Sequence, residues 1–159
     1  MNHTTIPTPA GPLTVVVNGD GAVQAAAFNE DPERLPAASR RLADLGDISK
    51  AVEAYLDGDL PAIDELPVQH PVAGAFIAAA WGTLRTIPPA APVTYRQLAA
   101  AAGRPAAVRA AANACARNPV ALLVPCHRVI RTDGGLGGYR WGLDVKRWLL
   151  HHEHTHGAH

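Results

Sequence analysis

The stretch TYRQLAAAAGRPAAVRAAANACARN, residues 94–118, decides the fold of the C-terminal half of this chain. Thr94 is typical of a helix N-cap and Gly103 of a helix stop, so the first ten residues are predicted to form one helix. Pro105 suits the first helical position, which predicts a second helix over 105–118. Two helices joined by a short turn that contains glycine are typical of a helix-turn-helix.

The second predicted helix carries a polar stripe on an alanine-rich surface. Arg109, Asn113 and Arg117 are spaced i, i+4 and i+8, so they share one face. The alanines around them make a slim helix that can approach a nucleic-acid groove closely. The alternative is a tightly packed core helix with a solvated basic edge, and the helix-turn-helix pattern alone leaves both interpretations open.

Charge is divided unevenly along a chain whose net charge is zero. Residues 1–72 carry four basic and eleven acidic side chains, whereas residues 73–159 carry ten basic and three acidic ones. A basic half indicates a surface for nucleic acid. The charge alone also allows a simpler interpretation, in which the two halves attract each other.

The segments outside the helix-turn-helix indicate an α/β N-terminal domain followed by a mainly α C-terminal domain, over 1–68 and 73–159. In the first domain, GPLTVVVNGDGAVQAAAF reads as a β-hairpin with an Asn-Gly turn signal. The other predicted elements are a short helix or loop over 31–46, a helix over 47–60 that Gly58 ends, a connection over 61–71, a helix over 73–89, a buried strand over 120–130 broken by Pro125, a glycine-rich loop over 131–139 and a last helix over 143–153.

The segment LLVPCHRVIR, residues 122–131, holds the residue of greatest chemical interest, Cys126. A thiol there can be core packing, a metal ligand or a nucleophile. A nucleophile needs a partner for its proton, and His127 is adjacent, although neighbours on a strand point apart and a water could bridge the pair. Glu153, at the end of an apolar helix face, is the acid best placed to orient the imidazole. Cys115, inside the alanine-rich helix, is interpreted as inert packing.

Metal, cofactor and membrane functions find little support in the sequence. Cys126 and His127 lack a second Cys/His pair at zinc spacing, and the two glycine-rich stretches lack the context of phosphate-binding loops. No apolar run reaches the roughly 20 residues of a membrane helix, and there is no signal-peptide pattern. We therefore expect a cytoplasmic protein with free thiols and no metal or cofactor. The histidines of the last ten residues are expected to form a solvated tail: His151, His152, His154, His156 and His159.

The motifs NPVALLVPCHRVI, GGLGGYRWGL and LLHHE resemble those of the O6-alkylguanine-DNA alkyltransferases. ACARN and GYRWG are most similar to the alkyltransferase half of bacterial adaptive-response regulators. The resemblance is dense over residues 73–153 and loose over 1–72. It implies a ribonuclease H-like N-terminal domain and a winged-helix-like C-terminal domain. It also implies a monomer without a cofactor that flips a damaged base out of duplex DNA. The protein would move an alkyl group, mainly methyl, from O6-alkylguanine, and also from O4-alkylthymine, to Cys126, once and irreversibly.

The resemblance also implies roles for individual residues. Cys126 would accept the alkyl group, His127 would deprotonate it through a bound water, and Glu153 would orient the imidazole. Asn118 would brace the turn at the cysteine, and Tyr95 would help to rotate the nucleotide and give a proton to the leaving guanine. The implied DNA contacts are Arg109, which fills the gap in the base stack, with Thr94, Arg104, Ala110, Asn113 and Arg117, and the implied lining of the base pocket is Val129, Tyr139, Arg140 and Trp141.

The chain departs from the family pattern at a few positions. Ala90 stands where many relatives have glycine, and Phe76-Ile77 stands where a Phe-Gln pair is common. Arg140 and Trp141 replace smaller residues of some relatives and should narrow the base pocket.

Three other functions are compatible with parts of the pattern. A protein that only binds alkylated bases would not need Cys126. A helix-turn-helix regulator would need more base-reading side chains than 105–117 offers. A Cys-His-Glu hydrolase would turn over repeatedly, and a reaction with alkylated DNA distinguishes all three.

Overall fold

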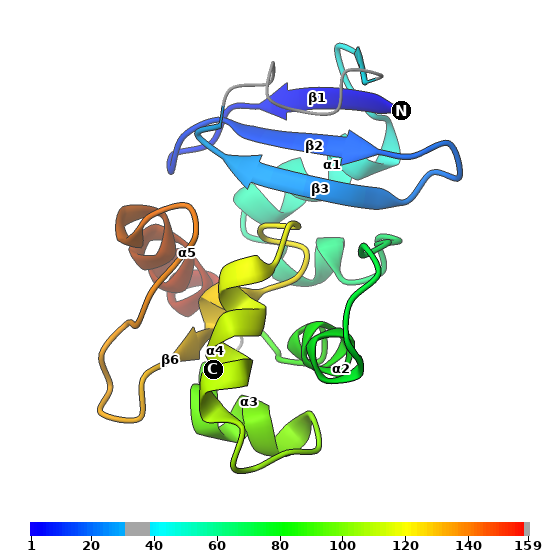
Figure 1. Cartoon of the computed structure of the whole chain (residues 1–159). Coiled ribbons are helices and arrows are strands. Elements are labelled where there is room, and N and C mark those ends of the chain that lie inside the picture. The colour runs from blue at the N-terminus through cyan, green and yellow to red at the C-terminus, as the bar shows by residue number, and fades with distance from the viewer. Residues whose placement is uncertain (31–38, 158–159) are drawn as a thin grey trace.

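The computed structural model describes residues 1–30 and 39–157. A four-stranded sheet forms one end of the molecule, with helix α1 (Asp47–Leu56) behind it, and most of the remaining helices form the other end (Figure 1). The first half of the predicted short helix or loop over 31–46 lies outside the described residues. The described part of that segment holds the two-residue strand β4 (Arg40–Arg41).

The sheet has the strand order β3-β2-β1-β4. The predicted hairpin is confirmed as β2 (Leu13–Val17) and β3 (Val23–Phe28), and the side chain of Asn18 accepts hydrogen bonds from two N–H groups of the connection. The sequence does not indicate β1 (Asn2–Ile6), because the prolines and threonines of its segment show no apolar alternation. This strand forms through antiparallel pairing with β2.

Helix α1 is shorter than predicted. Of its expected apolar residues, Ile48 and Val52 are buried, whereas Leu56 is only half-buried. The N–H groups of Gly58, at φ 107°, and of the residue after it bond back to the last turn, as in a glycine C-cap. A short 3-10 helix, η2 (Leu60–Ile63), follows.

The helix-turn-helix is confirmed as α3 (Tyr95–Ala101) and α4 (Val108–Arg117). Thr94 caps α3 in a capping box with Gln97, as its sequence position predicts. The prediction that Pro105 is the first helical residue of α4 was wrong: the turn extends to Ala107, which is the N-cap. The two helices pack against each other and against α2 (Ala75–Leu84), which ends four residues before Pro88.

The predicted buried strand over 120–130 was largely wrong. Residues 121–124 form turns, with Leu122 at φ 69°, and a 3-10 helix, η3 (Cys126–Arg128), follows Pro125. Only β6 (Val129–Ile130) is a strand, paired in parallel with β5 (Val93–Thr94). In place of strand pairing, this segment has local turn hydrogen bonds, and the side chain of Asn118 binds the carbonyl groups of Val120 and Val124.

The last helix, α5 (Leu143–His156), is longer than predicted. The prediction of a solvated histidine tail was wrong for His152, whereas His156 is exposed as predicted although its ring contacts His152. His152 is buried and stacks on Trp148, and the ring of His156 bonds to the carbonyl group of His152. His151 and His154 are exposed, and His159 lies outside the described residues.

The N-terminal sheet and the C-terminal helices share one continuous core. Ala26 of β3 exchanges backbone hydrogen bonds with Pro119 and Ala121, at 3.0 and 2.8 Å, so the turn before the cysteine lies on the edge of the sheet. The predicted division at residues 68–73 therefore falls between two parts that are packed together. Among the described residues, no helix has the length and apolar character needed to cross a membrane.

Candidate active site and DNA-binding surface

Cys126 is the first residue of η3, at the inner end of the loop that leaves α4. Asn118, the C-cap of that helix, is fully buried and its amide reaches the loop from inside. The Nδ2 group lies 2.9 Å from the carbonyl oxygen of Val124 and 3.4 Å from the Sγ atom of Cys126. The Oδ1 atom accepts from the N–H group of Val120. Asn118 therefore holds both ends of the turn and contacts the thiol itself.

A pocket of about 390 Å³ opens next to the thiol. The inner face of α4 forms one wall with small side chains, and the glycine-rich loop forms the other. Cys115 lies on this wall and is buried in the core, as the packing interpretation predicts. The lining residues are Tyr95, Ala112, Cys115, Ala116, Cys126, Gly138, Tyr139 and Arg140.

The predicted pocket residues divide into two groups. Tyr139 and Arg140 line the pocket, and the guanidinium group of Arg140 donates to the carbonyl group of Asn118 at 3.0 Å. Val129 and Trp141 do not line it. Val129 is buried in the β5–β6 pair, and the Trp141 ring lies behind, packed edge-on to Tyr139. Of the two residues expected to narrow the pocket, only Arg140 lines it. Its guanidinium group lies over the Trp141 ring.

Burial dominates the acidity of the thiols and phenols around the pocket. It raises the pKa of Cys126 to about 11, although the hydrogen bond from Asn118 and the charges of Lys146 and Arg140 act in the opposite direction. Burial also raises the pKa of Tyr95 to about 12. Both groups are thus protonated at neutral pH, and the thiol needs a base to become a nucleophile.

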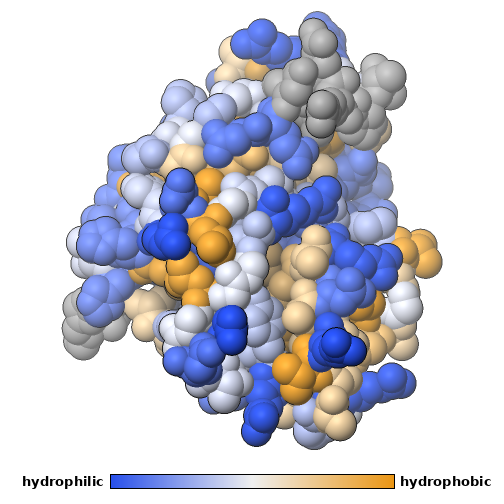
Figure 2. All heavy atoms as spheres, turned by 60° about the vertical axis from the view of Figure 1, so that its left-hand side comes forward, coloured by the Kyte–Doolittle hydropathy of each residue, from blue (hydrophilic) through white to orange (hydrophobic). Residues whose placement is uncertain are grey.

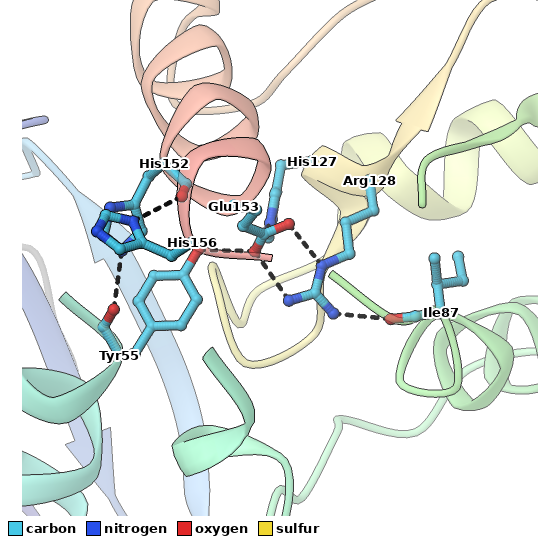
Figure 3. Close-up of polar contacts among 7 residues, drawn as sticks. All are labelled: Tyr55, Ile87, His127, Arg128, His152, Glu153 and His156. Carbon is cyan, nitrogen blue, oxygen red and sulfur yellow. Dashed lines mark hydrogen bonds and ion pairs between the residues drawn. The ribbon is translucent and has the colours of Figure 1, made fainter. Parts of the chain in front are cut away.

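His127 and Glu153 form the predicted pair, deep in the protein. The Nε2 atom of His127 lies 2.9 Å from the Oε2 atom of Glu153, and both side chains are inaccessible to solvent (Figure 3). Within the described part of the chain, the Nδ1 atom of His127 is buried without a hydrogen-bond partner. Burial lowers the pKa of His127 more than Glu153 raises it, so the imidazole is neutral with a free lone pair on Nδ1.

Arg128 is a site residue that the sequence prediction missed. Its Nε and Nη2 groups donate to the two oxygens of Glu153, at 2.9 and 2.8 Å, and its Nη1 group donates to the carbonyl group of Ile87 (Figure 3). Burial alone would raise the pKa of Glu153, but His127 and Arg128 outweigh it and hold that pKa far below its usual range. An arginine within the mainly apolar segment 120–130 is itself a signal, since a buried charge needs a partner.

The sequence prediction gave no role to Lys146, although this lysine belongs to the matched pattern, and it missed Tyr55. The ammonium group of Lys146 is fully buried and donates to the carbonyl groups of Val129, Leu136 and Gly138, which ties the glycine-rich loop to α5. Tyr55 comes from α1, and its hydroxyl group donates to Glu153 Oε2 at 2.7 Å (Figure 3).

The predicted DNA-binding residues surround α3 and α4. Arg109, Asn113 and Arg117 are exposed along α4, and Ala110 beside them is half-buried. Arg104 is exposed in the turn, where its guanidinium group lies over the Phe76 ring. Thr94 is half-exposed, with its side chain occupied in the capping box. Figure 2, turned toward the α5 side, shows apolar patches among many hydrophilic side chains.

The site thus combines a buried cysteine beside a pocket with a helix-turn-helix that carries exposed arginines. Comparison with known proteins identifies the class of protein. Residues 75–155 match the family model of the 6-O-methylguanine DNA methyltransferase DNA-binding domain. A methylated-DNA–protein-cysteine methyltransferase of Shigella flexneri is 37% identical over 93% of this chain and 92% of its own length. The chain belongs to this methyltransferase family.

Two further relatives extend the comparison. The bifunctional transcriptional activator and DNA repair enzyme Ada of Escherichia coli is 41% identical over 89% of this chain, which spans 39% of Ada. The crystal structure of Mycobacterium tuberculosis OGT in complex with DNA superposes with a TM-score of 0.86 at 29% identity, over 98% of this chain and 94% of the other. The mixed α/β fold is thus that of known methyltransferases.

Proposed function

We propose that this chain repairs alkylated DNA by direct reversal, moving the alkyl group of O6-alkylguanine, mainly methyl, to its own Cys126. The observation that carries the proposal is the position of the thiol. Cys126 lies on the pocket beside α4, next in sequence to a buried His127–Glu153 pair. Its neighbours supply a base for the thiol and a proton donor for a leaving group.

DNA binding begins with the outer face of α4 in this proposal. Arg109, Asn113 and Arg117 contact the DNA, with Ala110 allowing close approach and Thr94 and Arg104 on its flanks. An alkyl group on guanine O6 is out of reach in a stacked duplex, so the nucleotide must rotate out, at a cost of roughly a few kcal/mol. Arg109 offsets part of that cost by filling the gap in the base stack.

Proton transfer activates the thiol. Because burial keeps Cys126 protonated, a base must take its proton during the reaction, and the free Nδ1 lone pair of His127 suits that role. We infer that a bound water relays the proton, since no hydrogen bond joins the two side chains directly among the described contacts. Glu153 fixes the tautomer and stabilises the imidazolium that forms.

The transfer step is a displacement at the alkyl carbon. The S–C bond forms as the C–O6 bond breaks, and the electron pair of that bond goes to guanine. The phenol of Tyr95, protonated because its pKa is about 12, gives a proton to the leaving base. Tyr139 and Arg140 form the wall around that base, with Val129 and Trp141 supporting it from behind. The products are unmodified guanine and a thioether, which simple hydrolysis does not reverse, so each molecule acts once.

Several finer points belong to the same proposal. We infer activity on O4-alkylthymine and action as a monomer in the cytoplasm. No step of this mechanism needs a cofactor. We also infer a ribonuclease H-like N-terminal unit and a winged-helix-like C-terminal unit, an arrangement supported by the four-stranded sheet with α1 and by α3, α4 and β6.

One experiment tests the function. The protein is mixed with duplex DNA that contains O6-methylguanine, and its tryptic peptides are weighed. We expect one methyl group on the peptide of Cys126, stoichiometric with protein, and none in Cys126→Ser. Repeated turnover would indicate a hydrolase, and binding without a change of mass would indicate a recognition protein, and either result would overturn the proposal.

A further inference from the structure

Tyr55 connects the N-terminal unit to the centre of the candidate active site. It lies on the last turn of α1 and is fully buried, 98 residues before Glu153 in the sequence. It contacts two consecutive residues of α5. Its hydroxyl group donates to Glu153 Oε2 at 2.7 Å, and its carbonyl oxygen lies 2.8 Å from the Nε2 atom of His152 (Figure 3). The two bonds fix the position of the end of α1 relative to α5.

The hydroxyl group of Tyr55 binds the same oxygen as the imidazole. Glu153 Oε2 receives three hydrogen bonds, from Tyr55, His127 and Arg128, whereas Oε1 receives one. Burial and the charge of Glu153 raise the pKa of Tyr55, so its hydroxyl group stays protonated and acts as a donor. Each added donor restricts the rotation of the carboxylate and draws electron density from Oε2. The strength with which Glu153 binds the His127 proton therefore depends on the hydrogen bond from Tyr55.

We propose that Tyr55 is a positioning residue for alkyl transfer, which holds Glu153 in place and moderates its pull on the imidazole. The inference rests on the proposed function. It makes α1 part of the machinery, although every side chain to which the resemblance assigns a chemical role lies in the C-terminal part. Tyr55 acts through Glu153 and does not line the pocket.

The test compares Tyr55→Phe with Val52→Ala in the full-length protein. Tyr55→Phe removes only the hydroxyl group. Val52 is fully buried one turn earlier on α1, so Val52→Ala weakens the packing of that helix without touching Glu153. The rate of methyl transfer to Cys126 is measured from pH 5 to 9 with excess O6-methylguanine duplex, together with the urea midpoint of each variant.

We expect Tyr55→Phe to slow transfer by about ten-fold, the loss of one positioning hydrogen bond to a charged group. Without that donor, Glu153 binds the His127 proton more strongly and stabilises the imidazolium. The acidic limb of the rate profile should therefore move upward by roughly half a pH unit to one unit. Val52→Ala should lose stability and keep the wild-type profile.

A double-mutant comparison separates positioning from packing. In a Glu153→Gln background, Tyr55→Phe should cause little further loss of rate, because the residue through which it acts has changed. A wild-type rate and profile for Tyr55→Phe, or the same change in both tyrosine and valine variants, would overturn the inference. If the wild-type protein itself takes up no methyl group, the proposed function fails instead, so the two failures are distinct.

Discussion

Arg128 and Glu153 form a two-point ion pair in the interior of the protein. The Nε group of Arg128 donates to Oε1 and its Nη2 group donates to Oε2, at 2.9 and 2.8 Å, with both side chains almost fully shielded from solvent. The third arm of the guanidinium group binds the carbonyl group of Ile87, just before the link segment Pro88–Ala91. Arg128 therefore joins Glu153, the partner of His127, to the segment that leads into the helix-turn-helix.

Replacing Arg128 should destabilise the whole fold. Arg128→Met leaves the Glu153 carboxylate buried without its main cation, and we expect the free energy of unfolding to fall by about 3–5 kcal/mol, measured by urea denaturation. Arg128→Lys should recover only part of the lost stability, since an ammonium group cannot bind both carboxylate oxygens in the two-point geometry of a guanidinium group. The exposed Arg131, paired with Asp133, is the matched control, and Arg131→Met should cost less than about 1 kcal/mol. Equal losses at the two sites would contradict this prediction.

The reactivity of the free protein should rise with pH far into the alkaline range. Burial holds the pKa of Cys126 at about 11, and only the thiolate reacts, so alkylation by iodoacetamide should speed up with pH until about 11. The experiment uses a Cys115→Ser background, in which Cys126 is the only thiol that can be alkylated. Asn118→Ala removes a hydrogen bond that lowers this pKa and should shift the curve to higher pH. A plateau already reached near pH 8 would show that the thiol is activated without substrate.

Substitution of Gly137 should slow methyl transfer, because a side chain there would collide with Tyr95. Gly137 has φ 72°, and a Cβ atom there would lie 2.7 Å from the hydroxyl oxygen of Tyr95. Gly137→Ala should slow methyl transfer by about ten-fold or more, because the phenol or the loop must shift. Gly134 has φ 87° and open space around it, so Gly134→Ala carries the same backbone strain without the clash. It should lose a similar stability, about 1 kcal/mol, and keep the transfer rate.

Ala90 stores strain that glycine should relieve. Its φ is 62°, in the left-handed region, where a non-glycine residue costs about 1–2 kcal/mol. Allowing for the greater freedom of glycine in the unfolded chain, Ala90→Gly should stabilise the protein by about 0.5–1 kcal/mol and raise the Tm by roughly 2 °C. Ala91, whose φ is not positive, is the neighbouring control, and Ala91→Gly should lower the Tm. A decrease in both variants would argue against strain at Ala90.

Arg109 should matter only when DNA is a duplex. Arg109→Ala should slow repair of O6-methylguanine in duplex DNA strongly and leave the reaction with the free alkylated base nearly unchanged, since only a duplex has a base stack to fill. Arg41→Ala, an exposed arginine of the N-terminal sheet, should affect neither substrate. Equal slowing on both substrates would show that Arg109 acts on the chemistry instead of on flipping.

Local signals in the sequence were enough for several elements. The hairpin of β2 and β3 and the helix-turn-helix were predicted because turn and cap residues act on their immediate neighbours: Asn18 accepts the N–H groups of its own loop, and Thr94 and Gln97 cap each other. The chemistry at Cys126 was indicated by spacing and resemblance, and the structure places His127 and Glu153 within hydrogen-bond distance.

Only the tertiary structure decided the surroundings of that pair. Strand β1 pairs with a partner strand, the turn before Cys126 is held by Asn118 and by the edge of the sheet, and Glu153 collects donors from α1 and η3. The carboxylate and Tyr55 are 98 residues apart, and no periodicity or cap links such positions. The sequence by itself indicated the candidate reactive groups and the approximate positions of the main helices. The tertiary packing decided which of these groups are in contact. Each buried charge or donor needs a partner, and that partner comes from a segment distant in the sequence.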